Sequence, residues 1–129
     1  MEPEKFVDER YPLSEVTGRI IGAAHNVHNG LGPGFQEVIY QRALALECDQ
    51  QGLDFEREVE IPVYYRDALV GKKRVDFIIE GVMVEIKAKS AFDDADFIQT
   101  LSYLKASEYK IGLLLNFGAK KLEIKRFAN

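Results

Sequence analysis

The spacing of apolar residues changes near Gly52, and this change limits the chain to folds that combine helices with a sheet. Before Gly52 apolar side chains recur at steps of three and four residues, which predicts helices over residues 14–30 and 35–51. After Gly52 they alternate with polar side chains over short segments, which predicts strands. We predict strands at residues 55–65, 72–79, 82–88, 110–116 and 122–127, with one helix between residues 94 and 107. The order α-α-β-β-β-α-β-β indicates an α/β (α+β) fold built on one sheet.

Single residues add predictions about how these elements begin and pack. Ser14 is a suitable N-cap for the first helix, and Asp93 or Asp94 for the third. Pro62 cannot donate a main-chain hydrogen bond, so it predicts an edge strand or a bulge. Residues 67–71 are expected to form a loop. The predicted apolar stripe of the second helix consists of Val38, Ile39, Ala43 and Leu46, with Cys48 nearby.

The composition favours one globular domain. The chain has 129 residues, 47% of them hydrophobic, and we expect a single domain over residues 1–129 in which residues 1–13 form a partly ordered extension. Cys48 is the only cysteine, which excludes an internal disulfide and a zinc site made of several cysteines. We see no apolar run of about 20 residues and no signal peptide, so we expect a cytoplasmic protein without a membrane span.

Charge is unevenly distributed along the chain. The net charge of −4 argues against a general non-specific nucleic-acid binder, which would usually be basic. Residues 66–129 nevertheless hold 12 Lys and Arg against 9 Asp and Glu. This half could present a basic face to phosphates, or it could be an ordinary solvated surface.

A predicted hairpin brings two acids together. Glu80-Gly81 has the composition of a two-residue turn, and counting outward from it places Asp76 opposite Glu85. Opposed residues of an antiparallel pair share a face, with Cβ atoms about 4.5–5.5 Å apart. Lys87, two residues after Glu85, shares that face. The side chains expected on the other face, toward the core, are Val82, Val84 and Ile86.

Two close carboxylates repel each other unless a cation lies between them. Mg²⁺ typically binds one or two carboxylates together with water and phosphate oxygens, and the carbonyl of Ile86 could add a further ligand. Lys87 would then be placed to orient or deprotonate a water, or to stabilise charge on a phosphate. The alternative is a solvent-facing ladder of ion pairs in which Arg74 lies opposite Lys87.

Two sequence motifs resemble a known family. Asp76 followed by Glu85-Ile86-Lys87 is similar to the split motif of the PD-(D/E)xK nuclease superfamily, although Val75 stands in place of the proline. The segment Gly34–Tyr40 resembles the GxxExxY signature of a family of small uncharacterised proteins within that superfamily. The resemblance covers roughly residues 14–127. It implies a restriction-endonuclease-like core, a mixed β-sheet flanked by helices.

The resemblance also implies roles for particular residues. Asp76 and Glu85 match the metal-binding acids, and Lys87 matches the catalytic lysine. Glu37 matches an acid that often joins the metal site, but an acid is also favoured at a helix start by the helix dipole. Gln99 matches a polar residue that lines the site, but it could simply hydrogen-bond to Tyr103 or to water.

Together these features predict a metal-dependent nuclease. The expected cofactor is Mg²⁺ or Mn²⁺, and the expected substrate is a nucleic acid, DNA by analogy with the superfamily. The alternative is a catalytically inactive module of the same fold that binds nucleic acid or a protein partner. The resemblance also implies that a homodimer is one assembly to expect.

Overall fold

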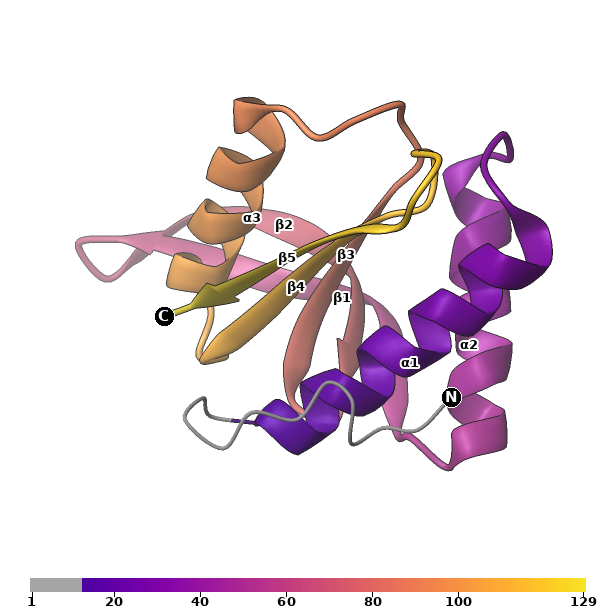
Figure 1. Ribbon diagram of the computed structural model, residues 1–129. Helices are drawn as coiled ribbons and strands as arrows, with labels where there is room; N and C mark the ends of the chain where they lie inside the picture. Colours follow the sequence, from indigo (N-terminus) through magenta and orange to yellow (C-terminus); the bar gives the residue numbers. More distant parts are fainter. Residues whose placement is uncertain (1–12) are drawn as a thin grey trace.

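The computed structural model describes residues 13–129, which form three helices and five strands. Their arrangement is drawn in Figure 1. The elements are α1 (Ser14–Leu31), α2 (Glu37–Gln51), β1 (Phe55–Tyr65), β2 (Ala68–Ile79), β3 (Val82–Lys87), α3 (Asp94–Ala106), β4 (Ile111–Asn116) and β5 (Glu123–Ala128). The predicted element order is confirmed. The predicted N-terminal extension lies outside the described residues except for Leu13.

The strands form one mixed sheet in the order β1-β2-β3-β4-β5. Neighbouring strands are antiparallel, except for β3 and β4, which are parallel. Parallel neighbours cannot be joined by a tight turn, so the chain crosses from β3 to β4 through α3. The predicted mixed sheet flanked by helices is therefore confirmed.

Helices cover both faces of this sheet (Figure 1). On one face α1 and α2 pack over a large apolar core that includes Phe77 and Val84. On the other face α3 covers a smaller cluster that includes Met83 and Leu104. All six residues of β4 are buried, as predicted from its nearly continuous apolar sequence.

The β1–β2 hairpin is longer than the sequence predicted. Arg66 and Asp67 both have positive φ angles, 48° and 64°, and form a tight turn that suits the twist of paired strands. Pairing therefore continues through residues 68–71, and the predicted loop is wrong. Pro62 lies on the edge strand β1, and a register shift follows it between Val63 and Tyr64, so both predicted consequences of the proline are present.

Much of this hairpin extends past the rest of the sheet. β3 pairs with β2 only over Phe77–Ile79, so residues 59–75 form a two-stranded ribbon without a third strand. Figure 1 shows this ribbon projecting at the left of the view. We call residues 59–75 the arm.

The predicted apolar stripe of α2 is partly wrong, because Ala43 packs against the core and Cys48 is buried but the other three residues are exposed. The helix buries Tyr40, Leu44 and Cys48, whereas Leu46 is 65% exposed. Tyr40 fixes this rotation, because its hydroxyl donates a hydrogen bond to the Gly32 carbonyl at 2.6 Å and its ring stacks on Phe117. The predicted stripe of Val38, Ile39 and Leu46 therefore faces outward.

The predicted starts of the helices were partly correct. Ser14 is the first residue of α1 rather than its N-cap, which is Leu13 in a left-handed conformation. Asp93 caps α3 and forms a capping box with Asp96. The three helices of residues 13–129 include none with the length and apolar character needed to cross a lipid bilayer.

Thr100 gives a stability prediction, because its hydroxyl is buried in α3 without a hydrogen-bond partner among the described residues. Thr100→Val keeps the shape and removes the unpaired polar atom, so we expect the free energy of unfolding to rise by about 1 kcal/mol. Thermal unfolding would measure this change. Ser102→Ala removes an exposed hydroxyl from the same helix and should raise the free energy of unfolding by no more than about 0.5 kcal/mol, through the higher helix propensity of alanine. A lower melting temperature for Thr100→Val would contradict the prediction.

Candidate active site

The β2–β3 hairpin positions the two predicted acids. Glu80 and Gly81 form its turn, with positive φ angles of 49° and 82°, and the three predicted pairs next to the turn are present. Beyond Phe77 and Val84 the ladder opens. The main-chain N–H of Asp76 donates to Glu85 Oε1 at 2.9 Å, and the N–H of Ile86 donates to Asp76 Oδ2 at 2.7 Å. Each carboxylate thus binds the main chain of the opposite strand, and the two acids are neighbours.

A local irregularity turns Asp76 toward β3. Phe77 packs with α1 and α2, whereas Val75 packs in the cluster under α3, so β2 changes face between these two residues. In β1 the opposite residue, Glu58, has a positive φ angle of 53°. The regular alternation of side chains is therefore interrupted at Asp76, and its carboxylate can reach the main chain of Ile86.

Helix α2 adds a side chain that the sequence analysis missed. Gln41 Nε2 donates to Asp76 Oδ1 at 3.2 Å, and Gln41 Oε1 accepts a longer hydrogen bond of 3.5 Å from Arg57 Nη2. The Arg57 guanidinium also lies 5.4 Å from the centre of the Phe77 ring. Gln41 is four residues after Glu37 and so lies on the same helix face, which is the sequence signal that could have identified it.

Lys87 and Gln99 meet across the crossover connection. Lys87 Nζ donates to Gln99 Oε1 of α3 at 3.3 Å. Asn116, the neighbour of Lys87 in β4, makes two hydrogen bonds to the main chain of Lys89, at 3.0 and 2.9 Å. This clamp fixes the end of β3, where Lys87 lies.

The predicted alternative of an ion-pair ladder with Arg74 opposite Lys87 is wrong. The β2–β3 pairing ends before either residue is reached. Arg74 lies opposite Glu60 in β1, and Lys87 lies next to Asn116 in β4.

Comparison with protein families agrees with this arrangement. A family model for the PD-(D/E)XK nuclease superfamily matches residues 14–127. The chain belongs to this superfamily. The matched PD-(D/E)XK region spans all three helices and nearly the whole sheet, which is consistent with a restriction-endonuclease-like α+β fold. Among curated proteins and among solved structures the chain has no match.

In this PD-(D/E)XK chain the five residues that were predicted to be catalytic lie in one region. Asp76 and Glu85 are linked through the hairpin, and Lys87 reaches Gln99. Glu37 contributes to the electrostatic field at both acids. The site is buried at Glu85, which is 6% exposed, and open to solvent at Glu37 and Gln99, which lie at the surface.

Burial dominates the electrostatics of the two acids. Burial and the neighbouring Asp76 carboxylate raise the pKa of Glu85 to about 8. Burial also raises the pKa of Asp76, and the Glu37 carboxylate adds to this effect. The Ile86 N–H and the positive charge of Lys87 oppose the rise at Asp76.

The residues present fit a divalent cation. PD-(D/E)XK nucleases generally use divalent metals. Within residues 13–129 no three His, Cys, Asp or Glu side chains are grouped so that they could hold an ion by themselves. The donors available to such an ion would be the carboxylates of Asp76 and Glu85, and main-chain and water oxygens would have to complete the set, as Mg²⁺ often requires. A bound cation would also relieve the repulsion that two buried carboxylates create.

These pKa shifts predict a pH-dependent stability of the metal-free protein. The folded-state pKa of Glu85 is about 8, above its ordinary value of 4.5, so protonation favours the folded state between these values. The resulting stabilisation, on the order of 5 kcal/mol, is present below pH 4.5 and is lost as the pH rises through 8. Denaturant unfolding between these pH values should therefore show that the free energy of unfolding falls more steeply with rising pH for the wild type than for Glu85→Gln. Glu108→Gln, at an exposed position, should behave like the wild type, and equal slopes in all three proteins would contradict the prediction.

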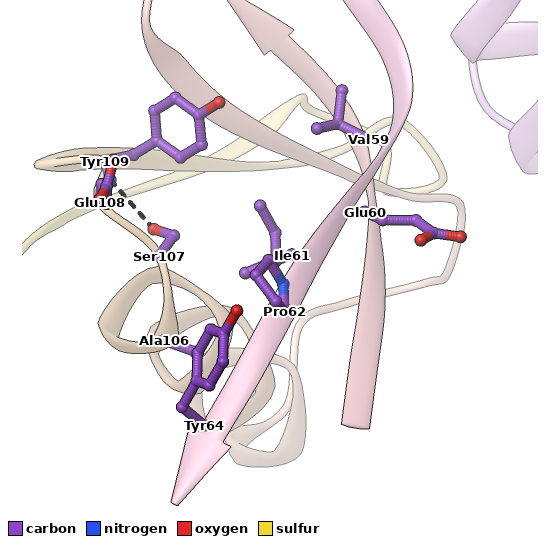
Figure 2. A pocket seen from close by; sticks show the side chains of 9 residues that line it. All are labelled: Val59, Glu60, Ile61, Pro62, Tyr64, Ala106, Ser107, Glu108 and Tyr109. Atoms are coloured by element: carbon purple, nitrogen blue, oxygen red, sulfur yellow. Dashed lines mark hydrogen bonds between the residues drawn. The ribbon is translucent and has the colours of Figure 1, made fainter. Parts of the chain in front are cut away.

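One pocket lies apart from this site. It has a volume of about 680 Å³ and is bordered by the arm and by the residues that follow α3. Figure 2 shows Tyr64 beside Ala106 on one side and Tyr109 on the other. None of the five predicted site residues lines this pocket.

Proposed function

We propose that the chain is a metal-dependent nuclease that hydrolyses phosphodiester bonds in DNA. The observation that supports this proposal is that Asp76 and Glu85 are neighbours beyond the β2–β3 ladder, and that the positive charge of Lys87 acts on both carboxylates. Membership of the PD-(D/E)XK superfamily supports a nuclease-like function. We further propose that the segment Gly34–Tyr40 assigns the chain to the GxxExxY family within this superfamily.

We assign Asp76, Glu85 and the carbonyl of Ile86 as ligands of Mg²⁺ or Mn²⁺, with Glu37 assisting. When bound, such an ion supplies Lewis-acid activation of the phosphate and a more acidic water. Lys87 orients the attacking water and stabilises the negative charge that develops on the phosphate oxygens. Gln99, which binds the Lys87 ammonium group, positions that group or the water.

A second candidate function is binding of nucleic acid without turnover. It is favoured by the hydrogen bonds that occupy both acids, because each carboxylate accepts a main-chain N–H. The absence of a third grouped acid within residues 13–129 favours it as well.

Nicking of supercoiled plasmid DNA separates the two candidates. We expect the wild type to nick the plasmid with Mg²⁺ or Mn²⁺ and to stop when EDTA is added. Glu85→Ala and Lys87→Ala proteins prepared in the same way control for contaminating nucleases. Nicking that is equal in all three proteins would refute the assignment, and no nicking by any of them would favour the binding module.

Calorimetric titration with Mn²⁺ tests the proposed ligands directly. We expect the wild type to bind Mn²⁺ more tightly at pH 8 than at pH 5, because protons compete for carboxylates whose pKa values are raised. Glu85→Gln should lose this binding. Unchanged binding by Glu85→Gln would exclude Glu85 as a ligand.

A further inference from the structure

The arm carries a concentration of positive charge in an otherwise acidic chain. Its β2 strand contains Lys72, Lys73 and Arg74 in succession, and all three are exposed. The only ion pair among them in the described part of the chain joins Lys72 to Glu60, with 3.7 Å between Nζ and Oε2 and both side chains largely exposed. Exposed ion pairs of this kind contribute little free energy, so these three cations remain available to bind another anion.

The end of the arm is apolar. Tyr64, Tyr65, Leu69 and Val70 are between 52% and 64% exposed, although large apolar side chains are usually buried. Arg66 lies over the Tyr65 ring, at 5.5 Å from its centre, and adds a cation to this end. The arm therefore combines a basic part, Lys72–Arg74, which we call the shaft, with an aromatic and aliphatic end, which we call the tip. The tip consists of Tyr64, Tyr65, Leu69 and Val70.

We propose that the arm binds nucleic acid, with Lys72, Lys73 and Arg74 on the phosphates and the tip against the bases. Lysine and arginine contacts to phosphates supply most sequence-independent affinity for nucleic acids. Aromatic side chains stack on bases, and apolar side chains can insert between base steps. This inference rests on the proposed function, which supplies nucleic acid as the ligand.

The position of the arm supports this ligand. The single strand β2 joins the tip to Asp76, and Lys72 lies about 13 Å from Asp76 at the usual rise per residue. A nucleic-acid strand that lies along Lys72–Arg74 would therefore be led toward Asp76 and Glu85. Pairing of two arms through their β2 strands is disfavoured in comparison, because it would bring two sets of three adjacent cations together.

The charged part of the proposal is tested by binding without cleavage. Fluorescence anisotropy of a labelled DNA duplex in EDTA should show about 10-fold weaker binding for Lys72→Ala/Lys73→Ala, and the dependence of log K on log salt should be less steep by about 2. The matched control is Lys120→Ala/Lys121→Ala, which removes two adjacent exposed lysines from the β4–β5 turn. Equal loss in both double variants would overturn the proposal.

The tip is tested by a different signature. Tyr64→Ala should weaken binding about 10-fold and leave the salt dependence unchanged, because it removes a stacking surface and no charge. Leu46→Ala, at an exposed apolar position of α2, is its control and should bind like the wild type. Light scattering of the same proteins completes the test: a Tyr64→Ala variant that loses self-association while binding DNA normally would overturn the proposal in favour of a second copy.

The outcomes distinguish this inference from the proposed function. Loss of binding in the arm variants together with a wild type that never cleaves would support the arm and refute hydrolysis. Cleavage by the wild type together with normal binding by every arm variant would refute the arm alone. Circular dichroism of each variant ensures that the compared proteins are folded.

Discussion

Lys87→Ala is expected to lower the rate of plasmid cleavage by about 10²–10⁴-fold, as removal of a group that moves a proton or stabilises transition-state charge commonly does. The substitution leaves Asp76 and Glu85 bound to each other's main chain. Affinity for Mn²⁺ should therefore remain close to that of the wild type. Single-turnover cleavage and calorimetry on the same protein measure the two properties separately.

The matched control is Lys110→Ala. Lys110 is an exposed lysine that directly precedes β4, and because β3 and β4 are parallel it lies at the end of the sheet opposite Lys87. The Lys110→Ala protein should cleave DNA at the same rate as the wild type. If Lys87→Ala kept full activity while Glu85→Gln was inactive, the assignment of the metal ligands would be supported and the proposed role of Lys87 would be wrong.

Gly118→Ala is expected to lower the free energy of unfolding by about 3 kcal/mol. A Cβ atom at this position would lie 2.5 Å from the carbonyl carbon of Ala88 and 2.6 Å from the carbonyl oxygen of Lys89. Both atoms belong to the main chain, so no change of rotamer relieves the contact. The displaced segment immediately follows Lys87, and cleavage should decline together with stability.

Gly112→Ala is the control for this effect. Its added Cβ would meet the Leu104 side chain at 3.5 Å, an ordinary van der Waals distance. Urea unfolding should therefore place Gly112→Ala close to the wild type and Gly118→Ala far below it. A Gly118→Ala protein of wild-type stability would mean that the turn after β4 does not press on the end of β3.

The hairpin shows how far the sequence determines this site. A two-residue turn leaves one register, so the neighbours of Glu80-Gly81 could be counted outward correctly as far as Phe77 and Val84. The predicted next pair is absent from the ladder, and Asp76 and Glu85 are instead linked by hydrogen bonds from their carboxylates to the opposite main chain. The position of Lys87 followed from the same count. Gln99 came from resemblance alone, since no local rule predicts which residue of a distant helix meets Lys87.

Other features depended on contacts that local patterns do not encode. The rotation of α2 is fixed by the stacking of Tyr40 on Phe117, a residue distant in the chain. With that rotation unknown, Gln41 could not be assigned to Asp76. The length of the arm depended on Arg66-Asp67 adopting two positive φ angles, a conformation in which Asp is enriched but Arg is uncommon.

The crossover through α3 separates the assembly of the site into an early and a late event. A β-hairpin forms from adjacent segments within about 1–10 μs, so the two acids can meet soon after they are synthesised. Lys87 is held by Phe117 N–H, which donates to its carbonyl at 2.9 Å, and by the Asn116 clamp, and both belong to the far end of the crossover. A nascent chain that ends before β4 therefore carries both carboxylates without an anchored ammonium group, and we expect it to remain inert toward nucleic acids around the ribosome.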